Sequence, residues 1–207
     1  MVKAAIIGCG KIAQVRHIPE YLEHQAVNLV GFYDLNEKRA EELAEKYGGK
    51  AYGSVEELLA DPQIDAVSIC TANHTHAELT IKALKAGKHV LCEKPMAITL
   101  EECQRMVECA EENHRKLLIG QNQRLTRTHQ IARKLIADGE IGNVLSFQTS
   151  FQHSGPESWS VDAGKNTWFF QKKAAAMGVM GDLGIHKTDL IQYLLDDQIV
   201  EVTAEFS

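Results

Sequence analysis

Prolines are scarce in this sequence, its cysteines form no C-x-x-C pair, and it has no long apolar run. Four prolines beside 15 glycines exclude collagen-like and proline-rich low-complexity chains. The five cysteines have neither metal-binding nor redox spacing, so we expect reduced thiols and no metal site. Because no segment resembles a signal peptide or a membrane span, we expect a cytoplasmic protein without a membrane partner.

Positive charge is also in short supply. Lysine and arginine number 22 against 28 acidic residues, which gives a net charge of −6. Because phosphate backbones attract a basic surplus, nucleic acid is not an expected partner. What remains is the composition of an ordinary globular chain, with 207 residues, 44% of them hydrophobic and 24% charged. This length is enough for one or two domains with a buried core.

Short apolar segments alternate with helix-like segments from the first residues to about residue 121. This alternation is typical of a parallel sheet covered by helices, so residues 1–121 are predicted to form a doubly wound α/β domain. S-x-x-E and T-x-x-E capping boxes at Ser54 and Thr99 predict two of the helix starts. The strands are predicted at 3–8, 27–33, 65–70, 89–92 and 117–121, with a weaker one at 51–52, and the helices at 11–24, 36–47, 54–60, 76–86 and 99–114.

The remaining residues, 122–207, predict a second domain that is not complete. We expect a basic amphipathic helix at about 126–137, a strand at 143–152, a helix at about 181–195 and a strand at 199–206. Two strands with little to cover them make an unfinished sheet, so we interpret this stretch as the first part of an α/β domain.

A glycine-rich motif follows the first predicted strand. Gly8, Gly10 and Ala13 fit the dinucleotide-binding pattern G-x-G-x-x-A at the start of a helix. The first glycine permits a tight turn, the second lets a pyrophosphate approach the backbone, and the alanine allows close packing of helix and strand. Asp34 ends the second predicted strand about 20 residues later, where its carboxylate can bind the ribose hydroxyls of adenosine.

The same carboxylate indicates which cofactor to expect. Asp34 would repel the 2′-phosphate of NADP, and no arginine follows it directly, so NAD is favoured. Lys38 and Arg39 lie close enough in the sequence to keep NADP as the alternative.

Three further stretches, 71–76 (TANHTH), 87–95 (GKHVLCEKP) and 181–189 (GDLGIHKTD), contain candidate functional residues. Together with the glycine motif, they make the chain resemble the Gfo/Idh/MocA family, named after glucose-fructose oxidoreductase, inositol dehydrogenase and a rhizopine-catabolism protein. The resemblance implies a Rossmann domain followed by an α/β domain with an open, mainly antiparallel sheet. It also implies bound NAD(P), a polyol or sugar substrate, and a dimer or tetramer at full length.

The resemblance implies three catalytic residues, Lys94, Asp182 and His186. Alcohol oxidation needs a base for the hydroxyl proton, and an imidazole with a pKa of about 6.5 suits that role. The Lys94 ammonium would stabilise developing alkoxide charge, and Asp182, four residues before His186, would share its helix face. The alternatives are a solvated loop lysine and a surface pair of charged residues at helical spacing.

The resemblance also implies the binding residues. The cofactor set is Gly8, Gly10, Lys11, Ile12, Asp34, Thr71, Asn73, His76, Glu93, Lys94 and Asn122, and the substrate set is Lys94, Arg124, Trp168, Asp182 and His186. Ala72 replaces the proline that is usual in the family, and Trp168 is equally consistent with plain packing. We expect His17 to be an ordinary surface or packing residue and Asp189 to be structural.

The leading hypothesis is an NAD-dependent dehydrogenase that acts on a secondary hydroxyl, or the corresponding ketone, of a sugar, sugar derivative or cyclitol. A non-catalytic dinucleotide-binding sensor or regulator on the same fold is the alternative, because fold alone does not determine function. A reductase of another carbonyl or of an imine is a third hypothesis, since its specificity would lie in the second domain.

Overall fold

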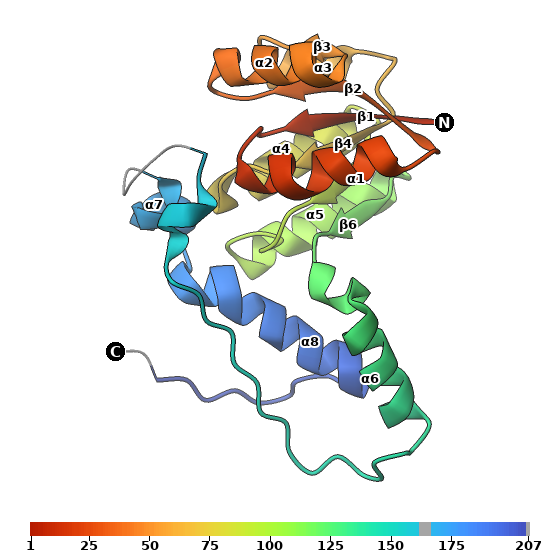
Figure 1. Ribbon diagram of the computed structural model, residues 1–207, viewed down its shortest axis with the longest axis vertical. Coiled ribbons are helices and arrows are strands. Elements are labelled where there is room, and N and C mark those ends of the chain that lie inside the picture. The colour runs from red at the N-terminus through yellow and green to blue at the C-terminus, as the bar shows by residue number, and fades with distance from the viewer. Residues whose placement is uncertain (162–166, 206–207) are drawn as a thin grey trace. The chain divides into compact units, whose positions relative to one another are not determined.

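The computed structural model describes residues 1–161 and 167–205, and the strands in these ranges form one six-stranded sheet. Every paired strand is parallel, and the order β3-β2-β1-β4-β5-β6 reverses direction between β1 and β4 (Figure 1). The doubly wound arrangement predicted for residues 1–121 is therefore present. The strands are β1 (Val2–Ile7), β2 (Val27–Tyr33), β3 (Lys50–Ala51), β4 (Ala66–Ile69), β5 (His89–Cys92) and β6 (Leu117–Ile119).

Helices connect the strands and continue beyond the sheet. The chain divides into two compact units, Met1–Gly120 with Ser154–Gly178, and Gln121–His153 with Val179–Ser207. The helices of the first unit are η1 (Ala13–His17), α1 (Ile18–Glu23), α2 (Glu37–Tyr47), α3 (Val55–Ala60), η2 (Asn73–Thr75), α4 (His76–Lys85), α5 (Leu100–Glu112), η4 (Pro156–Trp159), η5 (Trp168–Phe170) and α7 (Lys172–Ala175). Those of the second unit are η3 (Asn122–Leu125), α6 (Arg127–Ala137), η6 (Met180–Gly184) and α8 (Ile185–Leu195).

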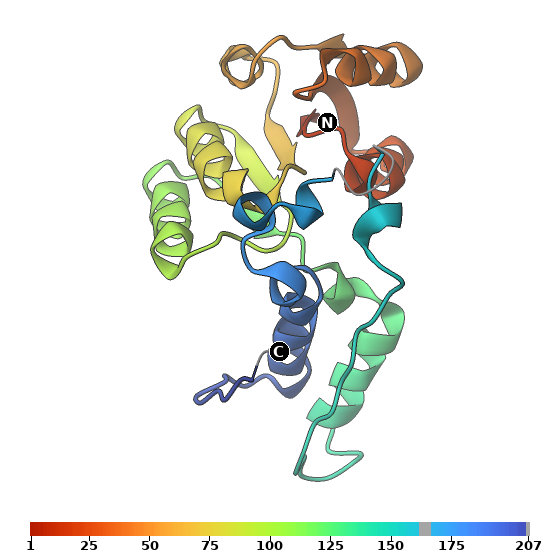
Figure 2. The ribbon, with the colours of Figure 1, turned by 90° about the vertical axis from the view of Figure 1, so that its left-hand side faces the viewer.

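Two hydrophobic cores lie on the two faces of the sheet, because side chains alternate between the faces along each strand. On β1, Ala5 and Ile7 face the core shared with α3, α4 and α5, whereas Ile6 faces the core shared with α1 and α2. Figure 2 shows these helices on opposite sides of the strands. Strands buried on both faces explain why the predicted segments read as short apolar runs.

Side-chain caps begin several of these helices. Thr99 and Glu102 form the predicted capping box of α5, in which each side chain bonds the backbone N–H of the other residue. Ser54 caps α3 by accepting from the Glu57 N–H at 3.0 Å, but the Glu57 carboxylate accepts from the Gly53 N–H instead. The positions predicted for the starts of both helices are confirmed.

The predicted sheet of the second domain is wrong. Residues 143–152 and 199–205 were expected to be strands, but the structure assigns neither segment to a strand, and residue 206 lies outside the described residues. An open, mainly antiparallel sheet was expected in the second domain. The only sheet of the described residues is the six-stranded one, and all its strand pairs are parallel. The physical reason is that a strand is stabilised by hydrogen bonds to partner strands, and two extended segments are too few for a stable sheet.

The second unit is built on α6 and α8, which pack side by side (Figures 1 and 2). The ring of Tyr193 on α8 lies beneath the guanidinium groups of Arg124 and Arg133, at 5.5 and 4.6 Å from its centroid. Arg133 also bonds the Asp196 carboxylate at 2.6 Å. Both predicted helices of this part of the chain are present.

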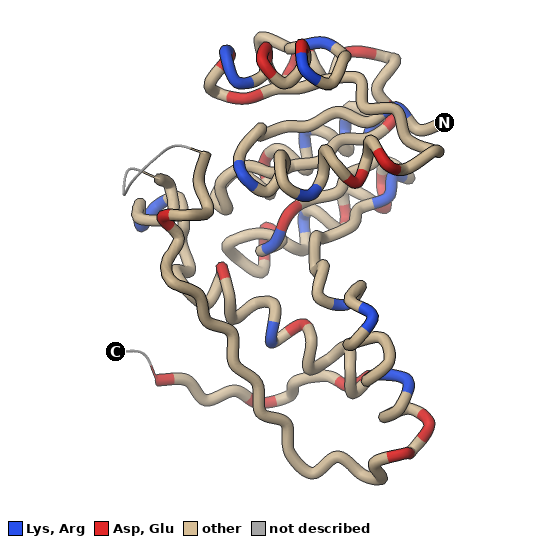
Figure 3. Tube along the Cα trace, in the orientation of Figure 1, with Lys and Arg blue, Asp and Glu red and all other residues tan. Residues whose placement is uncertain are grey.

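Charged side chains are unevenly distributed along the chain. Both signs are mixed along the helices of the first unit, whereas residues 141–156 carry no Lys, Arg, Asp or Glu (Figure 3). Among the described residues, no helix has both the length and the apolar character that a membrane crossing requires.

The core beneath α1 and α2 generates a stability prediction. Replacing the fully buried Phe32 by alanine leaves a cavity and should lower the free energy of unfolding by about 3–5 kcal/mol. Leu35→Ala is the control, because Leu35 is 93% exposed and its loss should cost at most about 0.5 kcal/mol. Urea denaturation of both variants measures the difference, and equal costs would contradict the described core.

Candidate functional site

The glycine motif forms a tight turn at the carboxyl end of β1. Gly8 has a φ of +92°, and a Cβ atom there would lie 2.8 Å from the backbone carbonyl carbon and oxygen of Cys70, which follows β4. A Cβ atom on Gly10 would meet nothing within 4 Å. Gly8 is thus required by the fold itself, while Gly10 leaves its backbone open to a ligand. An open backbone before a helix suits a pyrophosphate, so these residues fit a dinucleotide.

The helix after the turn begins with a rare local geometry. Residues Ala13–His17 form a π-helical turn, η1, which is a geometry found often at functional sites. Ala13 is fully buried, as the motif predicts for close packing on the sheet. Lys11 and Ile12 are half-buried at the start of this helix.

Asp34, at the end of β2, is hydrogen-bonded to the glycine turn. Its carboxylate accepts from the backbone N–H of Cys9 at 2.7 Å and of Asn36 at 2.8 Å. The Arg39 guanidinium donates to the same carboxylate at 3.2 Å. Burial, with the charge of Asp34, raises the pKa of the Cys9 thiol to about 12, so this thiol stays neutral. The structure therefore places both the expected ribose-binding acid and a guanidinium beside the turn.

Asn73 and His76, which follow β4, form hydrogen bonds to backbone carbonyls of neighbouring segments. The Asn73 amide donates to the carbonyl of Ala175 at 3.0 Å, which attaches α7 to η2. His76 is buried, with Nδ1 at 2.7 Å from the Pro95 carbonyl and Nε2 at 3.1 Å from the Thr71 carbonyl. Burial lowers the pKa of His76 despite these carbonyls, which favours a neutral ring with a single N–H that can donate to one of the two carbonyls. Ligand contacts by Thr71, Asn73 and His76 stay predictions.

Glu93 and Lys94 follow β5 directly. The Glu93 carboxylate is almost fully buried and is 2.8 Å from His17 Nε2, and it accepts from the Lys94 backbone N–H at 3.2 Å. Burial raises the pKa of Glu93, but the hydrogen bonds that the carboxylate accepts from His17 and from the Lys94 backbone, together with the Lys94 charge, outweigh that effect and leave the pKa lowered. Lys94 is half-buried, and its peptide bond to Pro95 is cis.

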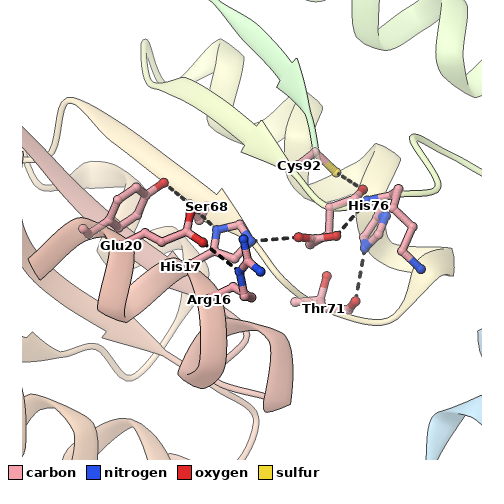
Figure 4. Close-up of polar contacts among 10 residues, drawn as sticks. Arg16, His17, Glu20, Ser68, Thr71, His76 and Cys92 are labelled. Atoms are coloured by element: carbon pink, nitrogen blue, oxygen red, sulfur yellow. Dashed lines mark hydrogen bonds and ion pairs between the residues drawn. The ribbon is translucent and has the colours of Figure 1, made fainter. Parts of the chain in front are cut away.

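His17 is the residue that sequence reasoning missed in this unit. It was expected to be an ordinary surface or packing residue; it is buried, as a packing residue would be, and its ring also bonds Ser68 and Glu93, with Ser68 beside it in Figure 4. Its position four residues after Ala13 is a signal that could have indicated burial, because residues at that spacing share a helix face.

The second unit places Asp182 and His186 one helical turn apart. Asp182 lies in the π-helical turn η6, and His186 lies near the start of α8, which continues from it. His186 is buried, and its ring centroid lies 5.7 Å from that of Phe151. The Nε2 atom of His153 is 3.6 Å from an Asp182 carboxylate oxygen. Phe151 and His153 were not predicted as site residues, and they come from the uncharged segment 141–156.

Arg124 and Trp168, the other predicted substrate residues, each contact a neighbouring side chain. Asp189 accepts two hydrogen bonds from the Arg124 guanidinium, one of them at 2.7 Å from Nε, and this hydrogen bonding raises the pKa of Arg124 further. In the first unit the Trp168 ring is stacked on Phe169, with centroids 4.0 Å apart. Asn122 is exposed on η3.

Sequence comparison identifies the family. A family model described as "Oxidoreductase family, NAD-binding Rossmann fold" matches residues 2–121. A second model, described as "GFO/IDH/MocA C-terminal domain", matches residues 129–207. The chain belongs to the Gfo/Idh/MocA family. The resemblance predicted from the four motifs is confirmed.

Relatives of this family member include sugar and inositol dehydrogenases. Glucose-6-phosphate 3-dehydrogenase of Bacillus subtilis is 35% identical over 201 residues, which are 97% of this chain and 55% of the relative. Myo-inositol 2-dehydrogenase of Thermotoga maritima is 31% identical over 207 residues, which are 100% of this chain and 58% of the relative. The chain thus spans a little over half the length of these relatives.

Solved structures of similar chains include complexes with both cofactors. GenD2 from gentamicin A biosynthesis, in complex with NAD, has a TM-score of 0.81 and 28% identity, covering 94% of this chain and 53% of that chain. KijD10, a 3-ketoreductase from Actinomadura kijaniata in complex with NADP, has a TM-score of 0.64 and 27% identity. The match covers 67% of this chain and 42% of that chain.

The two glycines of the turn generate the next prediction. Gly8→Ala should lower the free energy of unfolding by about 2 kcal/mol or more, because its Cβ clashes with the Cys70 backbone and its φ is positive. Gly10→Ala should change it by less than about 1 kcal/mol. Chemical denaturation of both variants tests this, and equal destabilisation would show that Gly10 also serves the fold.

Proposed function

We propose that this chain contains the cofactor-binding part, together with substrate-binding residues, of an NAD-dependent oxidoreductase. The enzyme transfers a hydride between NAD and a secondary hydroxyl or ketone of a sugar, sugar derivative or cyclitol. The observation that carries this proposal is the glycine turn. The fold leaves no room for a side chain at Gly8, whereas the space beside the Gly10 backbone is open, and Asp34 is hydrogen-bonded to the turn. Relatives named as sugar and inositol dehydrogenases support the substrate class.

The proposed cofactor contacts follow from that turn. The backbone around Gly10, Lys11 and Ile12 would hold the pyrophosphate at the start of the helix. Asp34 would accept hydrogen bonds from the ribose hydroxyls of the adenosine half. Arg39 is already paired with Asp34, so we propose that NAD is preferred over NADP and that Arg39 supports what NADP binding remains.

The proposed chemistry uses Lys94, Asp182 and His186. NAD supplies the hydride acceptor when bound. Lys94 would hold the reacting hydroxyl and stabilise negative charge on its oxygen as the proton leaves. His186 would accept that proton, and Asp182 would orient the imidazole or contact the substrate. The half-buried position of Lys94 and the one-turn spacing of Asp182 and His186 support these roles.

Further residues and boundaries belong to the same proposal. We propose a division into a Rossmann domain, 1–121, and a substrate-binding domain that starts at residue 122. Thr71, Asn73, His76, Glu93 and Asn122 would border the cofactor, and Arg124 and Trp168 the substrate. We also propose assembly into a dimer or tetramer.

Cofactor choice is tested by titration calorimetry of NAD and NADP. The unaltered chain should bind NAD more tightly, and Asp34→Ala should weaken NAD by about tenfold while weakening NADP less, because the lost carboxylate repels a 2′-phosphate. Arg39→Ala should instead weaken NADP more than NAD. An unchanged preference in both variants would remove these side chains from the ribose, and binding of neither cofactor would contradict the proposed function.

Catalysis is tested by a polyol and sugar screen with NADH absorbance as the signal. With a turned-over substrate in hand, Lys94→Ala and His186→Ala should each reduce turnover by about 10²-fold or more, with NAD affinity changed only a few-fold. Lys116→Ala and His24→Ala are the matched controls, since both side chains are exposed and outside the proposed site. Activity that survives both site variants would contradict the mechanism.

A further inference from the structure

A buried chain of hydrogen bonds links the helix after the glycine turn to the end of β5. Tyr21 on α1 bonds the hydroxyl of Ser68 on β4 at 2.5 Å, and Ser68 lies 3.2 Å from Nδ1 of His17. The Nε2 atom of His17 lies 2.8 Å from the Glu93 carboxylate. Figure 4 shows the imidazole of His17 beside Ser68. The proposed function assigns no role to Tyr21, Ser68 or His17.

The chemistry of the groups sets the direction of each bond. An ionised carboxylate can only accept, so Nε2 of His17 donates to Glu93. In a neutral ring Nδ1 then accepts from the Ser68 hydroxyl, whose oxygen accepts from the Tyr21 O–H. Every donor in this chain has an acceptor. Such a satisfied network holds its members in one arrangement, because breaking any bond leaves a buried polar group unpaired.

Glu93 is held tightly but keeps capacity for a ligand. Its second oxygen accepts from the Lys94 backbone N–H, and the carboxylate packs so closely on Gly120 that a Cβ atom there would lie 3.1 Å from it. Each carboxylate oxygen can accept two hydrogen bonds, so both retain a free acceptor position. With 12% of the side chain exposed, these positions can be reached from outside.

The sheet order shows which part of a dinucleotide Glu93 would meet. Dinucleotides bind across the carboxyl ends of the strands, one mononucleotide on each side of the point where the strand order reverses. Here that point lies between β1 and β4. Asp34 at the end of β2 is on the adenosine side, and Glu93 at the end of β5 is on the other side. His17 lies on η1, between β1 and β2, so its hydrogen bond to Glu93 joins the two sides of the point where the strand order reverses.

We propose that His17 is a positioning residue that holds the Glu93 carboxylate for the ribose hydroxyls on the nicotinamide side of NAD. This inference rests on the proposed function. It predicts a selective defect, in which loss of the His17 hydrogen bond weakens NAD but not ADP, since ADP has only the adenosine half and the pyrophosphate. A residue that merely supported the glycine turn would affect both ligands equally.

Two variants of His17 distinguish the role of Nδ1, which bonds Ser68, from that of Nε2, which bonds Glu93. An asparagine amide lies near the position of Nδ1 and can keep the bond to Ser68, but it is too short for Glu93. A glutamine amide lies near Nε2 and can still donate to Glu93. We therefore expect His17→Asn to weaken NAD by about tenfold, the size of one lost charge-assisted hydrogen bond, with ADP within about twofold. His17→Gln should keep NAD within about threefold of the unaltered chain.

A double-mutant cycle with Glu93→Ala tests whether the two residues act together. If His17 acts only through Glu93, the pair His17→Asn and Glu93→Ala should lose no more NAD affinity than Glu93→Ala alone. Calorimetry with NAD and ADP on the four proteins gives the affinities, and thermal unfolding confirms that each is folded.

The outcomes separate the two proposals. Equal losses for NAD and ADP in His17→Asn, losses that multiply in the double variant, or failure of His17→Gln to rescue would each overturn the role of His17 alone. If the unaltered chain bound neither NAD nor ADP, the proposed function itself would be overturned.

Discussion

The close approach of Gly8 to the backbone of Cys70 is the constraint on which the site depends. A Cβ atom at Gly8 would lie 2.8 Å from that backbone, so β1 and β4 can end side by side only because the turn carries a glycine. Parallel pairing then brings the ends of β2, β1, β4 and β5 to one edge of the sheet. This edge collects Asp34, Thr71, Glu93 and the open backbone at Gly10, and it lies where the strand order reverses, as ligand sites in such sheets do.

Buried polar groups pair with one another along this edge, because an unpaired polar group without water is costly. His17 bonds Glu93, His76 bonds the Pro95 carbonyl, and the Asn73 amide bonds the Ala175 carbonyl. These pairs link helices and strand ends of the first unit, α7 among them. Paired side chains have few alternative arrangements, so a ligand that binds at this edge would have less conformational entropy to overcome.

The second unit shows how local and long-range determinants of structure differ. Both α6, with its amphipathic pattern, and α8 were predicted as helices, because a helix satisfies its own backbone hydrogen bonds. The segments 143–152 and 199–206 were predicted as strands, the second on its alternation, but a strand depends on partners elsewhere in the chain. Asp182 and His186 needed only helical spacing to share a face, whereas Phe151 and His153 reached them from a segment about 30 residues away.

The sequence by itself determined the features that depend on neighbouring residues: the glycine turn, the capped starts of α3 and α5, the order of strands and helices to residue 121, and the family. Only the tertiary structure decided which distant polar groups meet. His17 and Glu93 are 76 residues apart, Arg124 and Asp189 are 65 apart, and Asn73 and the Ala175 carbonyl are 102 apart. No local pattern encodes such pairs, because each results from packing that brings separate elements together and leaves their polar groups to satisfy one another.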